Sequence, residues 1–305
     1  MKMNAKREVV LLKNYGFCYG VNHSIKIVLE TLKNNKYPRP IYLLNSIVHN
    51  KFVNDYFIKQ GIIILEGKSK LQLLDDVKEG TIIFSAHGVG DNIKAKAKSL
   101  NLTVVDATCP FVEKSYQLIK EYLNNGFHLL YIGKENHPEV ESVMSFSPNV
   151  TLINGKLPNI DSRFPLAIAH QTTMSDYDVD EIYQQVKQLE PNVQVLPMLC
   201  NATQLRQYEL KEYLSNNNLD NTLIIIVGDK QSNNCTKLFE LAKRYTENTI
   251  FIYDYNDLLN IDLNAFNKFV ISSGTSTPII CVQNIVKYLK GEKIIKKANL
   301  LSYIK

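Results

Sequence analysis

Short apolar runs alternate along this chain with longer segments in which apolar residues recur every three or four positions. Val9–Leu12 is one such run and Ile41–Leu44 is another. The segment between them places Ile25, Val28 and Leu32 at helical spacing. Runs of this length predict strands, and the intervening spacing predicts helices. Strands that alternate with helices indicate βαβ units and a mostly parallel sheet.

The order of strands and helices occurs three times, which predicts three small α/β lobes over residues 1–102, 103–192 and 193–305. The strand that opens each copy could pack in its own sheet or in that of a neighbouring copy. In chain order, the predicted strands are Val9–Leu12, Ile41–Leu44, Ile62–Leu65, Thr81–Phe84, Leu102–Val105, Phe127–Ile132, Val150–Ile153, Leu166–Ala169, Val193–Leu196, Leu223–Val227, Ile250–Tyr253 and Phe269–Ser272.

One cysteine follows the first predicted strand of each copy and precedes a helical pattern. Cys18, Cys109 and Cys200 stand at equal intervals along the chain. Their spacing is not that of a zinc ribbon or of a clustered ferredoxin motif. Three separate thiolates could hold a [4Fe–4S] cluster in which one iron has no protein ligand and acts as a Lewis acid. The alternative is that they are small buried apolar residues, which is the interpretation we favour for Cys235 and Cys281.

The predicted fold is therefore α/β, with three βαβ-type lobes in a pseudo-threefold arrangement around a central iron–sulfur cluster. The net charge of +5 is modest, and no dense basic stripe indicates nucleic-acid binding. Apolar runs fall far short of the roughly 20 residues that span a bilayer, and the basic start has no apolar signal core behind it. Five widely spaced cysteines suit a reducing compartment. We expect a cytoplasmic protein with no membrane or nucleic-acid partner.

Polar residues gather after the predicted strands, where parallel sheets bind their ligands. Histidine, serine and asparagine side chains can donate hydrogen bonds there, and backbone N–H groups at helix starts can cradle a phosphate. His49 and His87 could instead be loop histidines satisfied by backbone groups, and Ser276 could be a helix cap. No Walker A motif is present. The candidate anion-binding residues are His49, His87, His137, Ser232, Asn234 and Ser276.

Glu139 follows His137-Pro138 and is a candidate proton donor. Its other interpretation is a carboxylate favoured in the first turn of a helix. A donor role needs burial that raises the pKa of this carboxyl group. Thr172 or Thr173 could relay the proton.

Eight motifs in order resemble one family over nearly the whole chain, the 4-hydroxy-3-methylbut-2-enyl diphosphate reductases of the LytB or IspH type. The motifs are Gly16-Phe17-Cys18-Tyr19-Gly20-Val21, Val48-His49-Asn50, Ser85-Ala86-His87-Gly88-Val89, Asp106-Ala107-Thr108-Cys109-Pro110, His137-Pro138-Glu139-Val140-Glu141, Gln171-Thr172-Thr173-Met174-Ser175, Cys200-Asn201-Ala202-Thr203-Gln204 and Gly274-Thr275-Ser276-Thr277-Pro278.

The resemblance implies the last step of the non-mevalonate isoprenoid pathway. An allylic diphosphate would lose its hydroxyl as water, with two electrons and two protons, to give isopentenyl and dimethylallyl diphosphate. A ferredoxin or flavodoxin with its reductase would supply the electrons. By the same resemblance, Cys18, Cys109 and Cys200 hold a [4Fe–4S] cluster, and Glu139 delivers protons with Thr172 close by. The implied substrate-binding residues are His49, His87, His137, Thr172, Ser232, Asn233, Asn234 and Ser276.

Two positions depart from the family pattern. Tyr19 stands where the family often has a small residue, so its ring could crowd the cluster or point away. Asn233 replaces a serine in the phosphate loop. Two alternatives therefore stay open: a cluster-dependent hydro-lyase that needs no electrons, and a cluster-bearing diphosphate-binding or sensor protein that has lost turnover.

Overall fold

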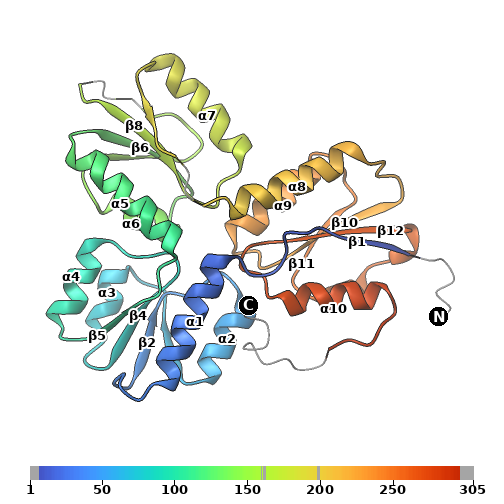
Figure 1. The fold of residues 1–305 in the computed structure, drawn as a ribbon, viewed down its shortest axis with the longest axis horizontal. Helices are drawn as coiled ribbons and strands as arrows, with labels where there is room; N and C mark the ends of the chain where they lie inside the picture. Colours follow the sequence, from blue (N-terminus) through green and yellow to red (C-terminus); the bar gives the residue numbers. More distant parts are fainter. Residues whose placement is uncertain (1–6, 159, 161–162, 198–199, 296–305) are drawn as a thin grey trace. The chain divides into compact units, whose positions relative to one another are not determined.

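Three four-stranded parallel sheets form the framework of the protein (Figure 1). The computed structural model describes residues 7–158, 160, 163–197 and 200–295. These belong to two compact units. The first unit comprises residues 1–22, 49–53 and 202–305, and the second comprises residues 23–48 and 54–201. The α/β class predicted from the apolar runs is confirmed.

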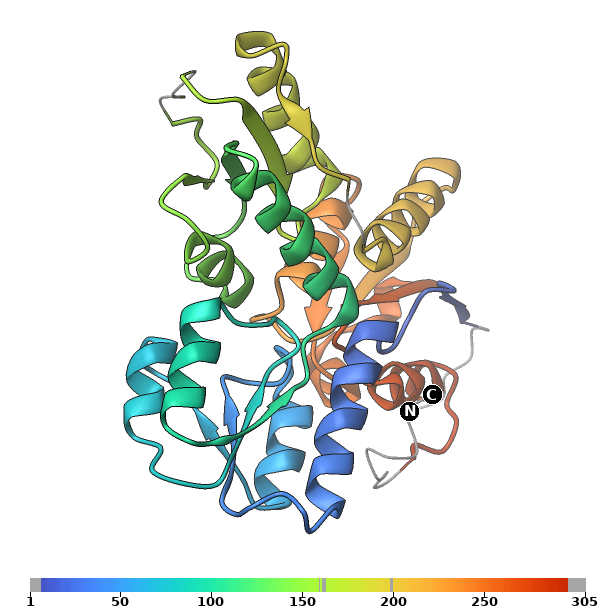
Figure 2. The same ribbon diagram turned by 60° about the vertical axis from the view of Figure 1, so that its left-hand side comes forward.

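The first unit contains one sheet, in the strand order β1-β12-β10-β11. Its helices α8 and α9 lie on one side of the sheet, and α10 lies on the other in both views (Figures 1 and 2). Its elements are β1 (Glu8–Leu11), α8 (Ala202–Asn216), β10 (Thr222–Val227), α9 (Asn233–Lys243), β11 (Thr249–Ile252), the 3₁₀ helices η1 (Tyr255–Asn260) and η2 (Leu263–Ala265), β12 (Lys268–Ser273) and α10 (Ile279–Leu289).

The central strand β10 is buried along its whole length, with Ile224 to Val227 fully inaccessible. A parallel strand covered on both faces needs apolar side chains on both, which explains its continuous apolar sequence. The same reason makes Phe269, Val270 and Ile271 of β12 fully buried. Polar residues are therefore confined to the strand ends.

The second unit contains the other two sheets, ordered β3-β2-β4-β5 and β7-β6-β8-β9. Helices α1 and α2 start among residues of the first unit and continue into the second. The elements are α1 (Tyr19–Lys33), β2 (Ile41–Leu44), α2 (Lys51–Lys59), β3 (Ile62–Leu65), α3 (Lys70–Asp75), β4 (Thr81–Phe84), α4 (Asp91–Ser99), β5 (Thr103–Asp106), α5 (Pro110–Asn124), β6 (His128–Ile132), α6 (Pro138–Met144), β7 (Val150–Ile153), β8 (Leu166–His170), α7 (Asp176–Leu189) and β9 (Gln194–Val195).

The strand that leads to each cysteine joins the sheet of another copy. β5, which leads to Cys109, pairs with β4, and β9, which leads to Cys200, pairs with β8. β1, which leads to Cys18, pairs with β12 near the other end of the chain. The pairing resolves the alternative that the sequence left open, whereas the lobe boundaries 1–102, 103–192 and 193–305 stay a prediction. Among the described residues, none of the helices has the length and apolar character that crossing a bilayer requires.

Candidate active site

In the first unit, predicted anion-binding residues meet where β10 and β12 end. Ser232 is the N-cap of α9, and its Oγ accepts from the N–H of Cys235. The hydroxyl of Ser276 lies 3.3 Å from Ser232 Oγ and 3.3 Å from the carbonyl oxygen of His49, to which it can donate. We call His49, Ser232, Asn234 and Ser276 the anion loop. Hydroxyl groups and the N-terminus of an eleven-residue helix thus converge in one place, which suits a phosphate.

Asn234 leaves one donor of the anion loop unused. The residue is 1% exposed, and its Oδ1 accepts the N–H of Thr275 at 2.8 Å. Its Nδ2 is buried and has no hydrogen-bond partner in the described structure. A buried donor without a partner is costly unless a ligand satisfies it. Asn233, the first residue of α9, is also buried.

Two glycines allow the anion loop to close tightly. A Cβ atom on Gly228 would lie 2.2 Å from the Sγ of Cys235, and one on Gly274 would lie 2.0 Å from it. No side chain fits at such distances, so both turns require glycine. Cys235 is fully buried, and this burial raises the pKa of its thiol. Burial also raises the pKa of Cys281 to about 12, so both thiols stay neutral, as expected for structural residues.

In the second unit, Glu139 forms a buried acid site with Tyr131 and Thr172. Glu139 is 2% exposed and lies in the first turn of α6. Its Oε1 accepts from the hydroxyl of Tyr131 at 3.0 Å and from the N–H of Thr172 at 3.0 Å, and its Oε2 accepts from Thr172 Oγ1 at 2.9 Å. We call these three residues the acid site. Sequence reasoning missed Tyr131, because one tyrosine inside an apolar strand resembles a core residue.

Burial raises the pKa of Glu139, since the charged carboxylate loses its hydration. The hydrogen bonds from Thr172 and Tyr131 act in the opposite direction but do not cancel the effect. Burial, followed by the nearby Glu139, raises the pKa of Tyr131 well above its ordinary value, so this phenol stays a neutral donor. The raised pKa of Glu139 meets the requirement for a general acid.

His137 connects the acid site to a second histidine. Its Nδ1 accepts the N–H of Glu139 at 3.2 Å and caps α6, so in the neutral ring the proton is assigned to Nε2. The rings of His87 and His137 meet edge to face, with centroids 5.4 Å apart. Tyr116 donates to the carbonyl of His87 at 2.7 Å, which fixes the turn at Gly88. The second unit contains four of the predicted site residues, namely His87, His137, Glu139 and Thr172.

Each predicted cluster ligand is a half-buried cysteine outside any disulfide, just ahead of a helix. The N–H of Val21 points to the Sγ of Cys18 at 3.4 Å. Cys109 is the N-cap residue of α5, and its N–H donates to the carbonyl of Ala86 at 3.0 Å. Cys200 precedes α8 by two residues. Helix N-termini favour negative charge, so this set of donors fits thiolate ligands of an iron–sulfur cluster. Tyr19 is 66% exposed, so no described protein group buries it.

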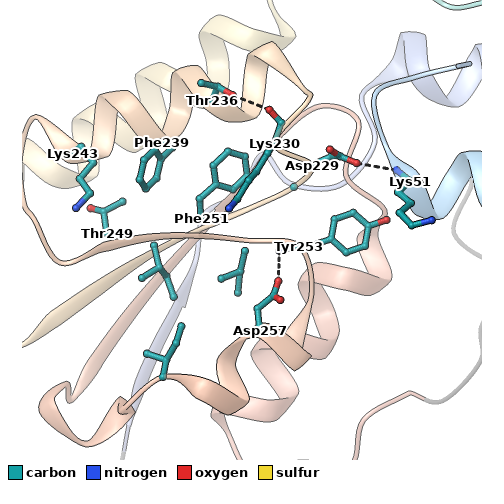
Figure 3. A pocket seen from close by; sticks show the side chains of 14 residues that line it. Lys51, Asp229, Lys230, Thr236, Phe239, Lys243, Thr249, Phe251, Tyr253 and Asp257 are labelled. Atoms are coloured by element: carbon teal, nitrogen blue, oxygen red, sulfur yellow. Dashed lines mark hydrogen bonds between the residues drawn. The ribbon is translucent and has the colours of Figure 1, made fainter. Parts of the chain in front are cut away.

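A groove of about 1040 Å³ runs along the edge strand β11 in the first unit (Figure 3). Phe239 and Phe251 lie on its floor, with Lys230 and Lys243 at its rim. Asp229 at one end accepts from the N–H of Lys51 at 3.0 Å. None of the predicted site residues belongs to the described lining of this groove.

The chain matches the family described as "LytB protein" over residues 9–290. Two relatives are each named 4-hydroxy-3-methylbut-2-enyl diphosphate reductase. The one from Brevibacillus brevis is 38% identical over 290 residues, covering 93% of this chain and 91% of the relative. The one from Macrococcus caseolyticus is 35% identical over 291 residues, covering 93% and 89%. A solved E-1-hydroxy-2-methyl-but-2-enyl-4-diphosphate reductase from Plasmodium falciparum aligns with a TM-score of 0.82 at 28% identity, covering 98% of this chain and 97% of that one.

Proposed function

Because the chain belongs to the LytB protein family, we propose that it is a 4-hydroxy-3-methylbut-2-enyl diphosphate reductase, the terminal enzyme of the non-mevalonate pathway. The observation that carries the proposal is the acid site, a buried carboxyl group with a raised pKa and three hydrogen-bond donors around it. Reductive loss of a hydroxyl group needs a proton source protected from bulk water, and this site supplies one.

The reaction consumes two electrons and two protons. The C–O bond of the allylic alcohol breaks, one proton joins the departing hydroxyl to form water, and the other joins carbon to give isopentenyl or dimethylallyl diphosphate. In the proposal, Glu139 holds the proton for the hydroxyl, and Thr172 Oγ1, 2.9 Å from its Oε2, passes it on. Tyr131 keeps the carboxyl group oriented through the hydrogen bond that its hydroxyl donates. Because the pKa of Tyr131 is raised, its hydroxyl keeps the proton that this hydrogen bond needs.

The proposed substrate-binding residues divide between the two units. In the first, the unused Nδ2 of Asn234, the hydroxyls of Ser232 and Ser276, Asn233 and His49 would hold the diphosphate. In the second, His87 and His137 would bind the substrate beside the acid site, with Nε2 of His137 as a donor. The negative charge of a diphosphate suits neutral and cationic donors of this kind.

Cys18, Cys109 and Cys200 are the proposed ligands of a [4Fe–4S] cluster. Three cysteines outside any disulfide and close to helix N-termini fit this group, and one iron would have no protein ligand. When bound, the cluster would supply single electrons and Lewis acidity. A ferredoxin or flavodoxin with its reductase is the proposed electron donor. Five widely spaced cysteines suit a reducing compartment, so we place the enzyme in the cytoplasm.

Anaerobic purification with iron and sulfide analysis, followed by product analysis with and without a chemical reductant, tests the proposal. We expect iron and sulfide in equal amounts, and products only when reductant is present. Products formed without electrons would identify a hydro-lyase instead. Diphosphate binding without any product under strong reductant would identify a sensor. A chain that holds no iron after anaerobic reconstitution would contradict the cluster.

A further inference from the structure

Arg206 of α8 is a buried arginine outside every motif considered so far. The residue is 5% exposed. Its Nη1 donates to the carbonyl oxygens of Ser273 at 2.7 Å and Gly274 at 3.0 Å, and its Nη2 donates to that of Gly16 at 2.7 Å. A guanidinium group presents these donors in a rigid plane, so the three acceptors are held in one fixed arrangement.

The three carbonyl groups belong to two segments that carry predicted site residues. Gly16 starts the turn that ends at Cys18, and it takes a φ of +79°. Ser273 and Gly274 start the loop that contains Ser276. The N–H of Gly16 also donates to Ser273 Oγ at 3.1 Å. Arg206 therefore ties the Cys18 turn and the Ser276 loop together.

A continuous path of hydrogen bonds lies just beyond these contacts. Asn234 Oδ1 accepts from the N–H of Thr275 at 2.8 Å, and the carbonyl of Thr275 accepts from the N–H of Cys18 at 3.0 Å. We call this the Asn234–Cys18 path. A ligand that accepts a hydrogen bond from the Nδ2 of Asn234 binds at one end of this path. The backbone of Cys18 lies at the other end.

Arg206 also brings a charge. Its described hydrogen bonds reach only carbonyl groups and Ser273 Oγ, not a carboxylate. An arginine stays protonated in proteins. A buried cation is expensive, so its hydrogen bond to Gly16, two residues before Cys18, suits a site that becomes anionic when ligands bind.

Glu209, one turn further along α8, offers a matched contrast. Its carboxylate accepts from the N–H groups of Lys13 and Asn14, and from Asn14 Nδ2 at 2.8 Å. Glu209 thus holds the chain ahead of Gly16, as Arg206 does. Its described hydrogen bonds do not reach the Ser276 loop.

We propose that Arg206 is a positioning residue that holds the Cys18 turn and the anion loop in one register, so that diphosphate binding and the surroundings of Cys18 are coupled. The inference rests on the proposed function for the roles of Cys18 and the anion loop. It adds a residue of the first unit that couples substrate binding at the anion loop to the surroundings of Cys18, a proposed cluster ligand.

The test uses the full-length chain, wild type and with Arg206→Met, Arg206→Lys or Glu209→Gln. Calorimetry measures the affinity for inorganic diphosphate, and redox titration of the reconstituted protein measures the midpoint potential of the cluster. Arg206→Met should lower the affinity about tenfold, because the Ser276 loop loses the contacts that hold it in position for the anion. It should also make the potential more negative, because the reduced cluster loses a nearby positive charge.

Arg206→Lys should restore the potential but not the affinity, since an ammonium group keeps the charge but cannot span three carbonyl groups. Glu209→Gln should keep the affinity for inorganic diphosphate close to that of the wild type. Wild-type affinity and potential in Arg206→Met would overturn the inference. An equal loss in Glu209→Gln would also overturn it, because general loosening of α8 would then explain both variants.

Hydrogen exchange on the wild-type chain covers the case in which the Arg206 variants do not fold. Inorganic diphosphate should slow exchange at the amides of both Thr275 and Cys18. Slowing at Thr275 alone would overturn the coupling while leaving the proposed function intact. A wild-type chain that neither binds diphosphate nor forms product would instead contradict the proposed function and, with it, this inference.

Discussion

The anion loop and the acid site differ in how many of their buried polar atoms already have protein hydrogen-bond partners. In the anion loop, Asn234 keeps a buried donor without a partner, and the hydroxyls of Ser232 and Ser276 lie beside a helix N-terminus. In the acid site, both carboxylate oxygens of Glu139 already have protein donors. The anion loop thus keeps a hydrogen-bond donor that a ligand could use, whereas the acid site has protein partners for both oxygens of its carboxyl group.

Burial therefore has a different effect on anion binding than on the pKa of a carboxyl group. Unused donors lower the stability of the empty protein but increase the free energy gained when an anion binds. Desolvation of a carboxyl group instead raises its pKa, and for Glu139 burial raises it more than the hydrogen bonds lower it. The proposed diphosphate donors of the anion loop and the proposed proton donor Glu139 thus belong to different units of the chain.

Replacing Glu139 with Gln should have the largest effect, because it removes the stored proton while keeping the shape of the side chain. We expect turnover to fall by a factor of about 10²–10⁴, the usual contribution of a general acid. Diphosphate affinity should stay within about twofold, since the anion loop is untouched. Steady-state kinetics and calorimetry on the same preparation measure both. Unchanged turnover would remove Glu139 from the mechanism.

Replacing Asn234 with Ala tests the opposite side of the contrast. The change removes the unused donor and the acceptor for Thr275, so affinity for inorganic diphosphate should fall by about 10–100-fold, the value of a hydrogen bond to a charged group. Asn217, an exposed asparagine of the same unit, provides the control variant Asn217→Ala. Equal affinities in the two variants would show that Asn234 does not bind the anion.

Replacing Gly274 with Ala should distort the anion loop without removing any polar group. The new methyl group would meet the Sγ of Cys235, and overpacking of this kind costs about 1–3 kcal/mol of unfolding free energy. Cys235→Ala in the same chain should restore part of the loss, because the obstructing sulfur is gone. Urea unfolding of the two single variants and the double variant measures the coupling. Strictly additive effects would argue against the close contact.

The smallest expected effect is a pH dependence of stability that the acid site alone should show. The folded-state pKa of Glu139 is raised, so its stability contribution is complete below the unfolded pKa of about 4.3 and is lost as the pH rises through the folded pKa. The amide that replaces the carboxyl group in the Glu139→Gln variant does not titrate. The unfolding free energy of wild type minus that of the variant should therefore fall as the pH rises, by at most about 1.4 kcal/mol per pH unit.

Urea unfolding of both chains between pH 4 and pH 8 measures this difference. It should level off once the pH exceeds the folded pKa of Glu139. A difference that stays constant, or that grows with pH, would contradict a raised pKa in the folded protein.

Much of the framework could be predicted from the sequence, because strand and helix signals are local. The continuous apolar run Leu223–Val227 predicted a strand, and β10 confirms it. At the other extreme, Val193–Leu196 predicted a full strand, yet β9 contains only Gln194 and Val195. Its single partner, β8, leaves it at the edge of a sheet, where fewer hydrogen bonds extend a strand.

Residues of the candidate site could be selected by chemistry and order, but their hydrogen-bond partners could not. Tyr131 and Arg206 carry no local signal, since a tyrosine in a strand and an arginine in a helix are ordinary. Their importance arises from contacts with residues that the fold brings close, such as Glu139 and Gly16.

By itself, the sequence determined the alternation of strands and helices, the position of each cysteine ahead of a helix, and the polar residues at strand ends, because these depend on neighbours a few positions away. Only the tertiary structure decided which sheet receives each opening strand, which donor of Asn234 remains unused, and how far Glu139 is removed from water. Those properties depend on desolvation and on contacts between distant segments, such as the one that Arg206 makes across 190 positions of the chain.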